Sequence, residues 1–83
     1  MIKFYVTMTE TMIAEQFRRA IVRVGLTQTG AARFFGVNER TVRRWADQEG
    51  EGPPGPVVKL LRLMMRMKWS AVEADERIYG KAE

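Results

Sequence analysis

The sequence predicts a small all-α protein, a bundle of four or five short helices containing a helix-turn-helix, with a short extended arm or β-strand before it. Apolar residues recur at three- and four-residue steps over most of the 83 residues, as they do in amphipathic helices. Glycines and capping side chains interrupt these stretches at short intervals. The β-prone residues 2–6 cannot form a stable strand alone. They either pair with the same segment of a second copy or lie as an arm.

The length suits a single domain spanning residues 1–83, with residues 1–8 as the arm or strand and residues 70–83 as a C-terminal extension. The first helix is predicted from Glu10 to Val24, with Thr9 as its N-cap and Gly25 as its stop. Its apolar stripe consists of Ile13, Phe17, Ala20, Ile21 and Val24. Three arginines lie off this stripe, toward solvent or phosphate: Arg18, Arg19 and Arg23.

The next two helices are predicted at Gln28–Phe35 and Glu39–Gln48, on either side of a tight turn at Gly36. Glycine adopts the left-handed backbone that such a turn requires. Ala32 is small enough for the two helices to cross closely, and Asn38 can cap the second of them. The positions expected to be buried are Ala31, Phe35, Val37, Val42 and Trp45. The spacing favours a core position for Trp45 over stacking on a base.

Residues 49–55 contain three glycines and two prolines, which predict a loop. Pro56 then opens a helix that is apolar nearly all round between residues 57 and 68, so it needs cover on more than one side. This helix is either the centre of the core or a surface for a partner, most simply a second copy of the chain, and both can hold. The residues expected on the dimer or partner surface are Leu60, Leu61, Met64 and Met67.

Ser70 and Glu73 have the spacing of a capping box, which predicts a last helix from Ala71 to Tyr79 that ends at Gly80. The alternative is one continuous helix from Pro56 to Tyr79.

Composition argues against an enzyme or a metal protein. The chain has no cysteine and no histidine, and its carboxylates form no obvious acid–base pair, so we expect no catalytic residues, no metal site and no cofactor. No signal peptide or membrane span is apparent, which predicts a cytoplasmic protein with no membrane partner.

The net charge of +4 is unevenly distributed. Seven arginines and one acid lie between residues 17 and 44, whereas six basic residues face seven acidic ones from residue 45 onward. A basic excess around two short helices is the pattern expected for binding phosphates.

The turn region resembles the Xre-like helix-turn-helix family, which includes the Cro and lambda-repressor type of DNA-binding domain. The matching residues are Leu26-Thr27-Gln28, Ala32, Phe35-Gly36-Val37-Asn38 and Thr41-Val42-Arg43-Arg44-Trp45, followed by the stretch from Pro53 to Leu61. The chain departs from many members at Phe35, where leucine is common, and at Ala46-Asp47-Gln48. The resemblance implies a helical bundle that binds double-stranded operator DNA, commonly as a homodimer.

Roles follow from which side of the third helix faces outward. The residues expected to read bases are Arg40 and Arg43. Arg44 either reads a base or binds phosphate, and Glu39 either accepts a hydrogen bond from cytosine or stabilises the helix start. Asn38 either caps the helix alone or also touches DNA. The residues expected to contact phosphate are Thr27, Gln28 and Arg33.

These residues favour a sequence-specific transcriptional regulator that reads a palindromic operator as a homodimer. A second interpretation keeps the fold but makes it a phage- or toxin–antitoxin-type nucleoprotein module whose helix 57–67 binds a protein partner. A third is a helical protein–protein interaction domain that binds no nucleic acid.

Overall fold

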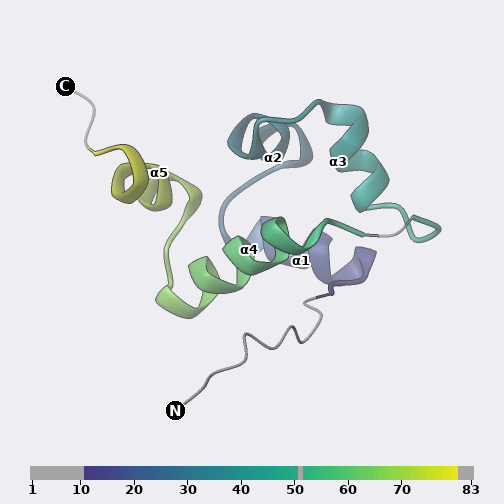
Figure 1. Ribbon diagram of the computed structural model, residues 1–83, viewed down its shortest axis with the longest axis horizontal. Coiled ribbons are helices and arrows are strands. Elements are labelled where there is room, and N and C mark those ends of the chain that lie inside the picture. Colours follow the sequence, from purple (N-terminus) through teal and green to yellow (C-terminus); the bar gives the residue numbers. More distant parts are fainter. Residues whose placement is uncertain (1–10, 51, 81–83) are drawn as a thin grey trace, which may run out of the picture.

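Five helices form the parts of the chain that the computed structural model describes, residues 11–50 and 52–80 (Figure 1). They are α1 (Ala14–Arg23), α2 (Gln28–Phe35), α3 (Glu39–Trp45), α4 (Gly55–Met67) and α5 (Ala71–Tyr79). These ranges contain no strand, which confirms the all-α prediction. The predicted arm or strand at residues 1–8, together with Thr9 and Glu10, lies outside the described residues.

The helices form two packed pairs and a flanking helix. α2 packs against α3, and α1 packs against α4. Figure 1 shows the α2–α3 pair above the α1–α4 pair, with α5 at the far end beside α2. The backbone N–H of Ala71 at the start of α5 donates to the carbonyl of Val24 at the end of α1, at 2.8 Å. Ala71 and Ala74 are the buried residues of α5.

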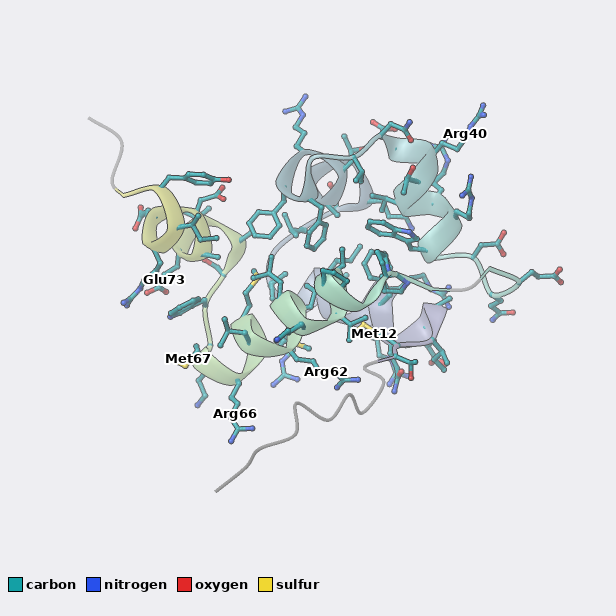
Figure 2. The ribbon with its side chains drawn as sticks, in the orientation of Figure 1. Met12, Arg40, Arg62, Arg66, Met67 and Glu73 are labelled. Atoms are coloured by element: carbon teal, nitrogen blue, oxygen red, sulfur yellow. The ribbon has the colours of Figure 1, made fainter. Side chains whose placement is uncertain are left out.

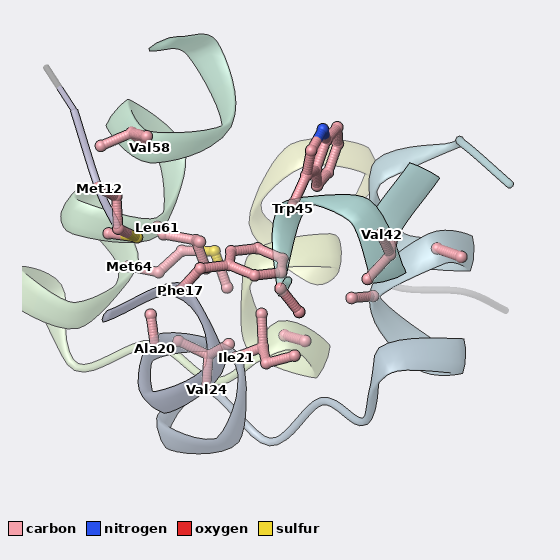
Figure 3. Packing of buried hydrophobic residues seen from close by; sticks show 14 of the residues in the cluster. Met12, Phe17, Ala20, Ile21, Val24, Val42, Trp45, Val58, Leu61 and Met64 are labelled. Carbon is pink, nitrogen blue, oxygen red and sulfur yellow. The ribbon is translucent and has the colours of Figure 1, made fainter. Parts of the chain in front are cut away.

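Phe17 of α1 lies at the centre of the core, between α4 and the turn motif (Figure 3). On one side are Leu61 and Met64 of α4, and on the other are Val42 and Trp45 of α3. Four of these five side chains are fully shielded from solvent, and Trp45 is 8% exposed. Each fully buried side chain of this size stabilises the fold by about 1.5–3 kcal/mol. One core therefore holds the motif against both α1 and α4.

The first helix starts later than predicted. Residues 11–13 precede the helix and Ile13 is its extended N-cap, at φ −78° and ψ 165°, so α1 begins at Ala14. Met12 is 5% exposed within the core cluster, and its carbonyl lies against Gly52. Packing of Met12 thus draws this segment out of the helix. Ile13, predicted on the apolar stripe, is 63% exposed because it precedes the helix.

The third helix ends at Trp45, three residues before the predicted end. The chain turns instead, with the N–H of Gly50 bonded to the carbonyl of Asp47 at 2.8 Å. Gly50 lies so close to the carbonyl of Arg44 that a Cβ there would collide with it. The turn folds back over the end of α3, which prevents another helical turn.

The continuous helix from Pro56 to Tyr79 is excluded, and the two-helix alternative is confirmed. α4 ends at Met67, and its C-cap, Lys68, has a left-handed backbone with φ 62° and ψ 36°. The N–H of Trp69 bonds to the carbonyl of Met64 at 2.8 Å, closing the end of the helix. Ser70 then caps α5 by accepting a hydrogen bond from the N–H of Glu73 at 3.1 Å.

The predicted partner surface on α4 needs correction. Leu61 and Met64 are fully buried in the core, and Leu60 is half-buried against it. Leu61 and Met64 are therefore unavailable to a second protein, and Leu60 is available only in part. The exposed apolar residues of α4 are Leu63, at 46%, and Met67, at 51%, of which only Met67 was predicted.

Candidate nucleic-acid interface

The entry to the motif is fixed by a local cap. Thr27 precedes α2 with an extended backbone, and its hydroxyl oxygen accepts a hydrogen bond from the N–H of Gly30 at 2.9 Å. The hydroxyl can still donate its proton, so capping and the predicted phosphate contact are compatible. Gln28, the first residue of α2, is only half-buried.

The turn between the two helices is made by Gly36, with φ 74° and ψ 32°. The N–H of Val37 bonds back to the carbonyl of Ala32 at 2.9 Å, so the chain leaves α2 at once. Ala31 and Ala32 are both buried, and their small side chains let α3 pack closely on α2. The predicted bend at Gly36 is therefore present, and it sets the angle at which α3 projects.

Asn38 caps α3, as predicted. Its side-chain oxygen accepts hydrogen bonds from the backbone N–H of Thr41 at 2.9 Å and from the hydroxyl of Thr41 at 3.1 Å. Its amide NH₂ remains a donor that can reach a base or phosphate. Contact of Asn38 with DNA stays a prediction.

The inner side of α3 is held by aromatic packing. The Trp45 ring meets Phe17 edge-on at a centroid distance of 5.8 Å, and Phe35 at 6.2 Å. Val42, one turn earlier, is completely buried. Trp45 is therefore a core residue, as the sequence favoured, and cannot stack on a base without leaving the core.

Arg18 has a role that the sequence analysis missed. Its guanidinium donates a hydrogen bond to the backbone carbonyl of Ala46, the residue that ends α3. Arg18 was expected to point to solvent or phosphate, but it is partly buried and ties α1 to the end of α3. The contact joins residues 28 positions apart, so no local pattern could reveal it.

The outer side of α3 carries the predicted base readers. Glu39, Arg40, Arg43 and Arg44 are all exposed. Arg40 projects away from the body of the protein (Figure 2). The guanidinium of Arg43 lies 3.5 Å from the carboxylate of Glu39, one helical turn earlier, and forms an ion pair with it. The two side chains are 62% and 51% exposed. Such a solvated pair is worth little, so Arg43 can exchange Glu39 for a base.

Four of the residues that were predicted to contact DNA lie close together in the structure. Gln28, Arg40, Arg43 and Arg44 line one open hollow between the start of α2 and the outer side of α3, with Asp47 at its edge. Arg33 and Thr27 are exposed but do not line this hollow. Arg33 lies in the last turn of α2, so any phosphate that it contacts is separate from those near Gln28.

A family model of homeodomain-like domains matches residues 10–57, more than half of the chain. The chain belongs to this family of helix-turn-helix domains. The matched range covers α1, α2 and α3 with the loop into α4, which are the elements that build the interface. No curated protein and no solved structure matched the chain.

Membership of this family confirms that the chain contains a helix-turn-helix domain, as the resemblance to Xre-like proteins implied. It does not single out the Xre-like subclass. In the described ranges, no helix is long and apolar enough to cross a bilayer. Those ranges also contain no cluster of acidic side chains suited to hold a metal ion.

Proposed function

We propose that this homeodomain-like domain is a sequence-specific, double-stranded DNA-binding transcriptional regulator with no enzymatic activity. The observation that carries the proposal is the division of α3 into two sides. Val42 and Trp45 fix the helix in the core, while Arg40, Arg43 and Arg44 stand exposed on the opposite side. A short helix held in this way presents its side chains to the major groove.

Each exposed residue has a role that its chemistry allows. Arg40 and Arg43 bind guanine O6 and N7 through their forked guanidinium groups. Arg44 binds a base or a phosphate, and Glu39 accepts from cytosine N4. Gln28 lies beside these arginines and contacts the backbone at the start of α2, where helix N–H groups favour phosphate. Arg33 and Thr27 add flanking phosphate contacts.

We further propose that two copies bind a palindromic operator in the cytoplasm, as the resemblance to Xre-like regulators implies. Leu63 and Met67 support this because they lie one turn apart on α4 and leave apolar surface exposed. The same pair supports a second candidate, a DNA-bound nucleoprotein module of the phage or antitoxin kind that docks a different protein there.

Selection of bound duplexes from a random pool tests the proposal. We expect enrichment of a short motif repeated in inverted orientation, with half-site centres about one helical turn, 10–10.5 base pairs, apart. The variant Arg40→Ala/Arg43→Ala is the control and should enrich no motif while remaining folded. Failure of the unmodified protein to enrich any sequence would contradict specific recognition, and a motif without symmetry would contradict the dimer.

A further inference from the structure

A second group of cations lies on α1 and α4. It consists of Arg19, Arg23, Arg62, Arg66 and Lys68, which we call the α1–α4 basic face. Figure 2 shows Arg62 and Arg66 at the lower edge of the molecule, whereas Arg40 of α3 projects from the upper right. Arg62 and Arg66 therefore lie on the other side of the molecule from Arg40 of the proposed groove-reading side.

The five residues form a continuous surface. Arg19, Arg23 and Arg62 line one open hollow between α1 and α4, and Arg23 and Lys68 line the next. Arg66 follows Arg62 by one helical turn on α4. No acidic side chain of the described residues lines either hollow, so the charged side chains that line them are all positive.

Four charged side chains of this face, Arg19, Arg23, Arg66 and Lys68, are exposed to an anion in solution. Arg23, Arg66 and Lys68 form no ion pair with any residue that the structure describes. Arg19 pairs with Glu15 at 2.8 Å, but the two side chains are 79% and 54% exposed, so water already competes for the contact. Arg62 donates a hydrogen bond to the carbonyl of Thr11 at 3.0 Å.

Lys68 strengthens the argument because of its backbone. Among the described residues it is the one non-glycine residue with a positive φ, 62°. Glycine adopts this conformation without the steric cost that a Cβ brings. The lysine that ends α4 places its charge in the same hollow as Arg23 despite the steric cost of this backbone.

We propose that the α1–α4 basic face is a second phosphate-binding surface, which binds one segment of duplex DNA while α3 holds another. This inference rests on the proposed function in one respect, that α3 binds the first duplex. Where both segments belong to one DNA molecule, α3 holds the second segment at a high effective concentration, so even weak phosphate contacts become occupied. The acidic residues of α5, Glu73, Asp75 and Glu76, lie outside the face.

A bridging assay with the full chain tests this proposal. One duplex carrying the selected site is immobilised, the protein is added, and capture of a second, labelled duplex without that site is measured against salt. We expect capture by the unmodified protein and at least a tenfold loss with Arg23→Gln/Arg66→Gln. Each lost phosphate contact should lower the slope of log affinity against log salt for the second duplex by about 0.9.

The control Val72→Glu/Tyr79→Glu changes the net charge by the same two units at exposed positions of α5, and it should leave capture unchanged. Affinity of Arg23→Gln/Arg66→Gln for the selected site should stay within about twofold, which separates this face from the groove contacts of α3. The proposed function is tested separately with Arg40→Ala/Arg43→Ala, which should lose binding to the first duplex, the one that carries the selected site.

Undiminished capture by Arg23→Gln/Arg66→Gln would overturn the second surface and would assign bridging to a dimer with one α3 on each duplex. Equal loss in the Val72→Glu/Tyr79→Glu control would also overturn it, because net charge would then explain the effect. Circular dichroism and thermal unfolding establish that both variants are folded before either result is used.

Discussion

At the scale of single residues, the arginines of this chain differ in role although the sequence shows one basic cluster. Arg18 holds the end of α3, Arg19 pairs with Glu15 in solvent, and Arg43 stands on the outer side of the third helix. Substitutions at these three positions should therefore give three different phenotypes.

Replacement of Arg43 by alanine should weaken binding to the selected site by about 1–3 kcal/mol and relax specificity at one base pair. The reason is the loss of a forked contact to guanine. Titration of matched and single-mismatch duplexes measures both effects. Arg33→Ala is the comparison and should weaken all sequences alike, as expected of a phosphate contact. Uniform weakening by Arg43→Ala would reassign that residue to phosphate.

Replacement of Arg18 by methionine should lower the free energy of unfolding by about 1–2 kcal/mol. Methionine keeps an apolar stem but loses the charged hydrogen bond to the carbonyl of Ala46. The measurement is urea denaturation followed by circular dichroism. Arg19→Met, which breaks an exposed pair, should change stability by less than about 1 kcal/mol. Equal losses at both positions would contradict the role given to Arg18.

At the scale of elements, caps and glycines account for most helix bounds. α2 lies at the predicted Gln28–Phe35 because Thr27 caps its start and Gly36 ends it, and both signals act within a few residues. The start of α3 follows Asn38 for the same reason. The start of α1 differs from prediction because of a distant contact, Met12 against Gly52. The end of α3 differs because the local turn at Gly50 folds back over Arg44.

The angle between α2 and α3 depends on the left-handed backbone of Gly36. Gly36→Ala should lower the free energy of unfolding by about 1–2 kcal/mol, since a Cβ disfavours this conformation. No atom lies within 4 Å of where that Cβ would sit, so steric crowding adds nothing. Gly36→Asn should lose less, because asparagine tolerates the left-handed region. Denaturant titration of the two variants checks the order, and an asparagine loss as large as that of alanine would refute this explanation.

At the scale of the whole molecule, α4 links the core to two surfaces. Its inner side supplies Leu61 and Met64 to the core. Its outer side carries the exposed pair Leu63 and Met67 and two arginines of the α1–α4 basic face, Arg62 and Arg66. A helix this apolar was expected to need cover on more than one side, and the structure leaves part of it uncovered.

If two copies associate through α4, Leu63→Gln/Met67→Gln should shift the protein from dimer to monomer with little change in folding. Sedimentation equilibrium over a range of concentrations measures the shift. The control is Ile13→Gln/Val22→Gln, which replaces two exposed apolar side chains away from α4. Ile13 is the N-cap of α1 and is 63% exposed, and Val22 lies within α1 and is 72% exposed. A dimer that survives the α4 substitutions, or a monomer at all concentrations of the unmodified chain, would remove this interface.

The sequence by itself determined the helical class, the turn at Gly36, the caps at Asn38 and Ser70, and the inward position of Trp45. These features depend on backbone preferences and on periodicity within one or two helical turns. Only the tertiary structure decided which side of α4 is buried, where α1 begins and what Arg18 binds. Those outcomes depend on contacts between residues far apart in the chain, for which helical periodicity carries no information.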